Sequence, residues 1–141
     1  MIDPVALRAE LDNDPASLGY APFMASGNNT ALVALLNETH AADQVSRGLI
    51  PSHEIIEATV AVDWAALTDP QQRQYMAITG AGQVNASAVN VRDAFLAMFA
   101  GGTATRANLA ALEARDGSRV EVLFGAGSVA SLFDVREARK V

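Results

Sequence analysis

The sequence predicts an all-α protein, a single compact domain over residues 1–141 with about seven short helices and glycine-rich joints. Through most of the chain, apolar residues recur three and four positions apart, which is the spacing of one helix face. Asp, Ser or Thr precedes several of these stretches, where such side chains can cap a first helical turn. Glycines follow several of them, as is common just past a helix C-terminus.

Composition favours an ordered domain and excludes several kinds of site. The chain has 141 residues, of which 50% are apolar and 18% are charged, far from the composition of disordered chains. Cysteine is absent, which excludes disulfides, thiolate nucleophiles and cysteine-ligated metal sites. The formal net charge of -6 opposes long-range attraction to phosphate backbones, so nucleic acid is not an expected partner.

Neither a secretory signal nor a membrane span is expected. Residues 1–4 lack the basic and then apolar pattern of a signal peptide. No apolar run approaches the roughly 18 residues that a membrane-spanning helix needs. These patterns predict synthesis in the cytoplasm and no membrane partner.

The first predicted helix runs over residues 4–11. Asp3 can accept hydrogen bonds from amides of the first turn, and Pro4 has no amide that needs a partner there. Leu7 and Leu11 then lie on one face and are expected in the core. Residues 17–23 combine Gly and Pro with large apolar side chains, so we expect an irregular loop packed on the core.

A second helix is expected after the polar caps of residues 26–29. Its Leu32, Leu35 and Leu36 recur at the spacing of a buried face.

A third helix is expected after a turn at residues 47–51. Ser52 is its expected N-cap, and Ile55, Ile56 and Val60 are expected to face inward. Residues 59–63 alternate β-branched and small side chains, so an extended piece competes there with helix or irregular structure.

Two more helices are predicted in the middle of the chain. Asp69 and Pro70 open one that runs to about residue 79 and ends in the glycines of residues 80–82. The next carries the clearest amphipathic spacing in the sequence, formed by four large apolar residues: Val91, Phe95, Met98 and Phe99.

Three helices with N-caps are predicted in the C-terminal third of the chain. Thr103 is expected to cap a helix with Leu109 and Leu112 inward, which Gly117 closes. Two capping boxes then follow, in which a serine and an acidic residue lie three positions apart: Ser118 with Glu121, and Ser131 with Asp134.

No catalytic, cofactor-binding or metal-binding residue is predicted, and an enzyme is not expected. Residues 125–130 fit a G-x-G-x-x-A fingerprint, but only eleven residues follow, too few for a dinucleotide-binding unit. His40 and His53 lack the spacing of metal ligands, so surface or capping roles are favoured. No G-x-S-x-G nucleophile motif is present.

In two places, a binding role remains open beside a purely structural one. Residues 118–140 could form a helix-turn-helix that reads DNA with Arg136, Arg139 and Lys140, although three acidic residues in the same stretch oppose this.

Large amphipathic side chains are typical both of cores and of protein interfaces, and four are candidates: Tyr20, Phe23, Trp64 and Tyr75.

Six segments of the chain resemble a family of small proteins encoded in tailed-bacteriophage genomes among virion structural genes. The resemblance lies in residues 7–11, 14–15, 19–20, 50–54, 105–109 and 117–125. It implies a virion structural or accessory protein, with the head-to-tail or tail region as a candidate location and no assigned functional residues. Its implied partners are other virion proteins and copies of itself.

Two other classes of function are weighed beside this one. The first is a phage-encoded DNA-binding or regulatory protein that uses the C-terminal helical pair. The second is a small enzyme or host-directed inhibitor that depends on His40 or His53.

Overall fold

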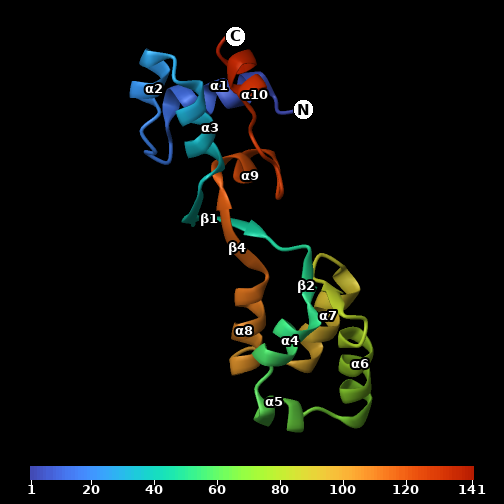
Figure 1. Ribbon diagram of the computed structural model, residues 1–141. Helices are drawn as coiled ribbons and strands as arrows, with labels where there is room; N and C mark the ends of the chain where they lie inside the picture. The colour runs from blue at the N-terminus through green and yellow to red at the C-terminus, as the bar shows by residue number, and fades with distance from the viewer. The chain divides into compact units, whose positions relative to one another are not determined.

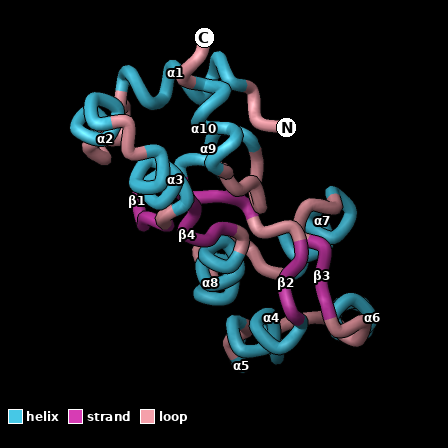
Figure 2. The backbone as a smooth tube through the Cα atoms, turned by 45° about the horizontal axis from the view of Figure 1, so that its top comes forward, coloured by secondary structure: helices cyan, strands magenta, loops and turns pink.

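The computed structural model describes residues Met1–Val141 and contains ten helices and four short strands (Figure 1). The strands form two small antiparallel sheets of two strands each, β1 with β4 and β2 with β3 (Figure 2). The prediction of an all-α fold with about seven helices is therefore wrong. The protein is mixed α and β, with 57% of its residues in helices.

The elements follow one another along the chain with short connections. In order they are α1 (Pro4–Asn13), α2 (Ala21–Ser26), α3 (Asn29–Asn37), β1 (Thr39–Ser46), β2 (Leu49–Pro51), α4 (Ser52–Ala58), α5 (Ala61–Ala65), α6 (Asp69–Thr79), β3 (Gln83–Asn85), α7 (Val89–Met98), α8 (Ala104–Leu112), β4 (Ala114–Ser118), α9 (Arg119–Phe124) and α10 (Leu132–Ala138). The longest helix, α6, has 11 residues, and no helix is long and apolar enough to cross a bilayer.

The chain forms two compact units, each with its own core. Unit 1 comprises Met1–Val45 and Asp116–Val141, and unit 2 comprises Ser46–Arg115. This division does not test whether the two units fold together, so the single domain predicted over residues 1–141 stays a prediction.

Unit 1 is a helical cluster built from both ends of the chain. Helix α10 packs against α1 and α3, and α3 also packs against α2 and α9. Seven residues of its core are fully buried: Leu7, Tyr20, Leu32, Leu36, Val120, Val135 and Ala138. The predicted inward positions of Leu7 and Leu11 in α1, and of Leu32 and Leu36 in α3, are confirmed.

Unit 2 surrounds a core that is rich in aromatic side chains. Strand β2 pairs antiparallel with β3, which places Ile50 opposite Val84, and both side chains are buried. Tyr75 of α6 contacts Phe95 and Phe99 of the α7 region at ring-centroid distances of 6.1 and 6.2 Å. These edge-on contacts are favourable because the positive ring edge meets a negative ring face.

Four predicted N-caps are confirmed. The side chains of Asp3, Thr103, Ser118 and Ser131 each accept a hydrogen bond from a backbone amide of the helix that follows. Both predicted capping boxes are also formed, so the acidic residue at the third helical position reaches back to the capping serine.

Two other predicted helix starts are shifted by one residue. Ser52 is the first residue of α4 rather than its cap; Pro51 occupies the cap position, and no side chain caps this helix. Helix α6 is capped by Thr68, which forms a capping box with Gln71, so that Asp69 lies within the first turn.

Two local predictions differ from the structure, and one alternative that the sequence left open is resolved. The expected loop at residues 17–23 contains the start of α2, since Pro22 fits the first turn of a helix. Gly117 lies in β4 instead of closing a helix, because α8 already ends at Leu112. In residues 59–63 both alternatives occur, as Thr59 and Val60 are extended and α5 begins at Ala61.

Gly117 allows β4 to approach β1 closely within unit 1. A Cβ atom at this position would lie 2.7 Å from Cγ1 of Val45 and 3.1 Å from the carbonyl oxygen of Asp43. Such distances are shorter than any normal carbon contact. Only glycine fits between these two strands without moving one of them.

We predict that Gly117→Ala lowers the free energy of unfolding by about 1–3 kcal/mol, the usual cost of inserting a methyl group into a packed site. Urea unfolding measures the difference. Gly48→Ala is the matched control, because its Cβ would lie 3.8 Å from the nearest atom, the Oγ of Ser87. Equal stability of the two variants would contradict the close approach of the strands.

Candidate functional site

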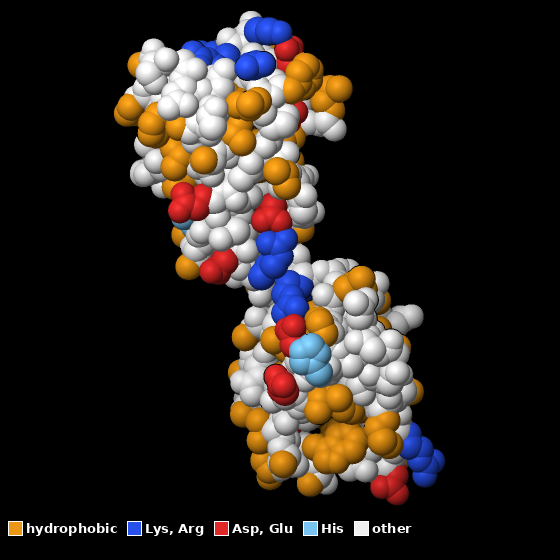
Figure 3. All heavy atoms as spheres, viewed as in Figure 1, with side chains coloured by type: hydrophobic (Ala, Val, Ile, Leu, Met, Phe, Trp, Pro, Cys, Tyr) orange, Lys and Arg blue, Asp and Glu red, His pale blue; other side chains and the backbone are white.

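An apolar groove on unit 2 is the first candidate for a functional site. It lies between α4, α5 and α6, has a volume of about 360 Å³, and is lined by Ile56, Thr59, Ala61, Trp64, Tyr75, Met76 and Thr79. We call it the Trp64 groove. Figure 3 shows hydrophobic side chains gathered over these three helices. No lining residue carries a charge at neutral pH.

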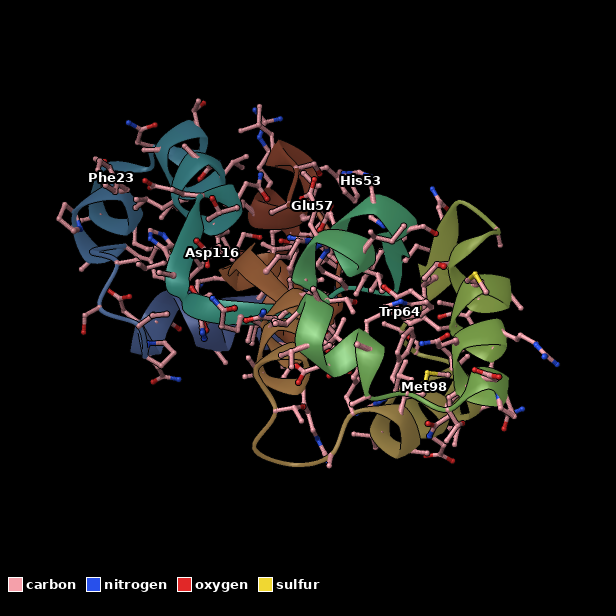
Figure 4. All side chains as sticks on the ribbon, turned by 90° about the horizontal axis from the view of Figure 1, so that it is seen from below. Phe23, His53, Glu57, Trp64, Met98 and Asp116 are labelled. Carbon is pink, nitrogen blue, oxygen red and sulfur yellow. The ribbon has the colours of Figure 1, made fainter.

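The threonine and tyrosine hydroxyls of the Trp64 groove are hydrogen-bonded within the protein. The hydroxyls of Thr59 and Tyr75 lie 2.7 Å apart, and the Thr59 hydroxyl also donates to the Ile55 carbonyl at 2.8 Å. The Trp64 and Tyr75 rings meet edge to face with centroids 5.0 Å apart. In Figure 4, Trp64 lies near the middle of unit 2, next to α6. The groove therefore presents a fixed apolar surface.

Large apolar side chains at the edge of the Trp64 groove are open to solvent. Ile56 is 55% exposed and Met76 is 54% exposed. The prediction that Ile56 faces inward is therefore wrong, because only its neighbour Ile55 reaches the core. Aromatic residues and Met are enriched at the centres of protein interfaces, so the groove is suited to an apolar side chain of a protein partner.

A second cavity of unit 2 lies between α7 and α8, beside the β2–β3 sheet. We call it the α7–α8 pocket. Its volume is about 270 Å³, and its apolar lining includes Ile50, Val84, Phe95, Phe99 and Leu109. Helix α7 packs against α6 and α8 packs against α4, so the two helices that line the pocket have different main neighbours.

Three charged side chains line the α7–α8 pocket. Arg92 and Glu113 face each other with Nε and Oε1 4.0 Å apart, and both side chains are about half exposed. Arg106 is half-buried, and its guanidinium makes no hydrogen bond or ion pair. No sequence pattern marks this arginine, because its lack of a partner depends on how the helices are placed.

The two histidines lie in different units, His40 in unit 1 and His53 in unit 2. His40 is in β1, and its Nε2 is buried without a hydrogen-bond partner. His53 is on α4, as is Glu57 (Figure 4). The structure holds no group of three potential metal ligands.

Beside His53, the carboxylate of Glu54 pairs with Arg47 through two hydrogen bonds of 2.7 and 3.1 Å. These hydrogen bonds lower the pKa of Glu54 and raise the pKa of Arg47. Arg47 is therefore the main partner of the Glu54 carboxylate.

The fingerprint-like segment at residues 125–130 is held by the protein itself. The Gly127 amide donates to Oε1 of Glu121 at 2.8 Å. Asn37 donates to the Ala130 carbonyl at 2.9 Å and accepts from the Ala130 amide at 2.8 Å. The Gly127 amide is therefore engaged with a carboxylate of the protein, and the Ala130 backbone with Asn37.

Most cations of the C-terminal helical pair are engaged within unit 1. Arg139 donates to Oδ1 of Asn29 at 2.7 Å and to the Met24 carbonyl at 3.1 Å. Lys140 pairs with Glu137. Of the three cations considered for DNA reading, only Arg136 has no such partner.

A buried ionic cluster joins α1, β1 and α9 in unit 1. Arg119 donates two hydrogen bonds of 2.9 Å to the Glu10 carboxylate and one of 3.1 Å to Asp43. The side chains of Arg119, Glu10 and Asp43 are only 14%, 2% and 9% exposed. The hydrogen bonds with Glu10 and Asp43 raise the pKa of Arg119, so its charge is fixed.

Tyr20 lies against the same cluster, with its hydroxyl 3.4 Å from Oε1 of Glu10. Burial, followed by the charge of Glu10, raises the pKa of Tyr20. Burial also raises the pKa of Tyr75, although its hydrogen bond with Thr59 opposes the shift. Both tyrosines of the chain are therefore held neutral in the folded state.

We predict that Arg119→Met lowers the free energy of unfolding by about 3–5 kcal/mol, because it leaves two buried carboxylates without their cation. Chemical denaturation measures the loss. Arg8→Met is the control: Arg8 pairs with Asp12 at 2.6 Å, but both side chains are at least one-third exposed, so a loss of about 0.5 kcal/mol is expected. Similar losses in the two variants would argue against the buried cluster.

We predict that the two tyrosines ionise only as alkali unfolds the protein. Since folding raises the pKa of both tyrosines, their contribution to stability is complete below about pH 10, the ordinary tyrosine value, and is lost as the pH rises through the folded-state values. Tyrosinate absorbance and circular dichroism, recorded together, should change at the same pH. Tyrosinate formation near pH 10 with intact dichroism would contradict this prediction.

Comparison with models of protein families, with curated proteins and with solved structures found no match to this chain.

Proposed function

We propose that this protein is a structural or accessory component of a tailed-bacteriophage particle, which packs against other virion proteins and against copies of itself. The observation that carries the proposal is the Trp64 groove, a solvent-open apolar surface with no charged lining residue. The sequence resemblance to proteins encoded among virion structural genes supplies the phage context. Location in the head-to-tail or tail region belongs to the same proposal.

The composition of the Trp64 groove favours binding of protein over catalysis. Its only titratable side chain is that of Tyr75, whose hydroxyl is already paired with Thr59. The threonine hydroxyls are likewise engaged in hydrogen bonds within the protein, so no hydroxyl of the groove is positioned to act as an acid, base or nucleophile. It can accept an apolar anchor residue, and such residues carry most of the binding energy at protein interfaces.

Unit 1 carries exposed apolar side chains that could serve as this anchor in a second copy. Phe133 on α10 is 58% exposed, its neighbour Leu132 is 41% exposed, and Val129 just before the helix is 70% exposed. An aromatic side chain contributes a large apolar area when it is buried. We therefore assign Phe133 of one copy to the Trp64 groove of the next.

This contact joins two different surfaces and is therefore head-to-tail. Repetition of such a contact produces a ring where the rotation closes and a filament where it does not. Both forms are suited to a repeated part of a particle.

We predict that Met76→Glu and Phe133→Asp each abolish self-association. Each change places an unpaired charge in an apolar interface, which should raise the dissociation constant at least tenfold, about 1.4 kcal/mol. Sedimentation velocity should show each variant alone as a monomer of 14.8 kDa. An equimolar mixture should form a one-to-one complex, since the first variant keeps its anchor and the second keeps its groove.

Val89→Glu is the control, because Val89 is 68% exposed on α7 and lies outside the groove. It should associate like the unchanged protein. A mixture of the two test variants that stays monomeric would contradict the head-to-tail contact.

The location in the particle is tested separately by mass spectrometry of purified virions. The protein should be present in a fixed ratio to other virion proteins. Its presence in infected-cell lysate but not in particles would overturn the virion role and leave the self-association result unaffected.

A further inference from the structure

We propose that the α7–α8 pocket binds a small amphipathic anion, consisting of a compact apolar body and one acid group, with Arg106 as the residue that holds the acid. This site is separate from the Trp64 groove, since the two share no lining residue. The proposal does not depend on the protein being part of a virion.

The pocket provides an apolar floor for the body of the ligand. Phe95 and Phe99 stack with centroids 6.4 Å apart, and Ile50 and Val84 from the paired strands close the base. Burial of an apolar group here would be favourable because it removes apolar surface from water. The volume of about 270 Å³ lies just below the range of about 300–1,000 Å³ typical of drug-sized ligands. A small ring or short chain fits this space better than a nucleotide.

Arg106 provides the charge for recognition of the acid. It lies on α8 one helical turn before Leu109 and Ala110, so that all three side chains line the same cavity. Its Nη1 lies 3.6 Å from the Cβ position of Gly101, beside the loop before α8. Because Arg106 is half-buried and its guanidinium has no partner, the guanidinium donors remain available for charge-assisted hydrogen bonds to a carboxylate or sulfonate.

The other two charged residues of the α7–α8 pocket do not reverse its preference for an anion. Arg92 and Glu113 are opposite charges at a separation of 4.0 Å, and their exposed side chains largely offset each other. Arg106 therefore leaves the pocket with a net positive charge. An apolar cation or a neutral analogue of the same size should bind more weakly.

The test uses two fluorescent probes with the same rings, on the full-length protein. Anilinonaphthalenesulfonate carries an acid group, and phenylnaphthylamine does not. We expect one saturable sulfonate site, with an affinity about tenfold lower in Arg106→Met, and phenylnaphthylamine binding unchanged within twofold. Arg106→Lys, which keeps the charge but not the planar fork, should lie between the two. Displacement by octanoate, but not by octanol, should reproduce the preference for an acid.

Three control variants show where the probe binds. Arg73→Met removes an exposed arginine of α6 that does not line the pocket, and it should have no effect. Ala110→Trp should fill the pocket and abolish binding of both probes, whereas Met76→Glu in the Trp64 groove should leave both unchanged. Circular dichroism and thermal unfolding verify that each variant is folded. Equal loss of sulfonate binding in Arg73→Met and Arg106→Met, or full binding in Ala110→Trp, would overturn the proposal.

Discussion

The guanidinium of Arg119 is the interaction on which unit 1 depends, because it joins segments that are far apart in the sequence. It connects Glu10 of α1 and Asp43 of β1 to the start of α9. A buried ion pair is costly to desolvate, and it stabilises a structure only when its remaining hydrogen bonds are satisfied. Here one cation serves two carboxylates, and the Tyr20 hydroxyl lies beside them. The arrangement fixes which surfaces of these segments meet, and the leucines of α1 and α3 then pack around it.

Unit 2 uses an aromatic centre in place of a buried charge. Tyr75 contacts Trp64 on one side and Phe95 and Phe99 on the other, while its hydroxyl is held by Thr59. The same residue therefore belongs to the core and to the wall of the Trp64 groove. Because its position is fixed by several rings, the groove is formed before any partner arrives, which lowers the entropy cost of binding.

The helices could be predicted from the sequence because their signals are local. A capping residue and its partner lie within four positions, and the capping boxes at Ser118 and Ser131 were both identified. The strands could not be predicted in this way. Strand β1 contains Ala, Asp and Gln, which have little preference for strands, and its partner β4 lies about 70 positions further along the chain. The Trp64 groove and the isolation of Arg106 likewise depend on helix placement, although Trp64 and Tyr75 were recognised as core or interface residues.

The division of unit 1 into two stretches of chain has a consequence for synthesis on the ribosome. All of unit 2 is translated before the residues from Asp116 onward, so unit 2 can complete its core while unit 1 still lacks α9 and α10. During this interval Glu10 and Asp43 have no Arg119, and Leu7 and Leu32 lack the cover of Val120 and Val135. The core of unit 1 around α1 and α3 therefore stays incomplete until residues 116–141 have been translated.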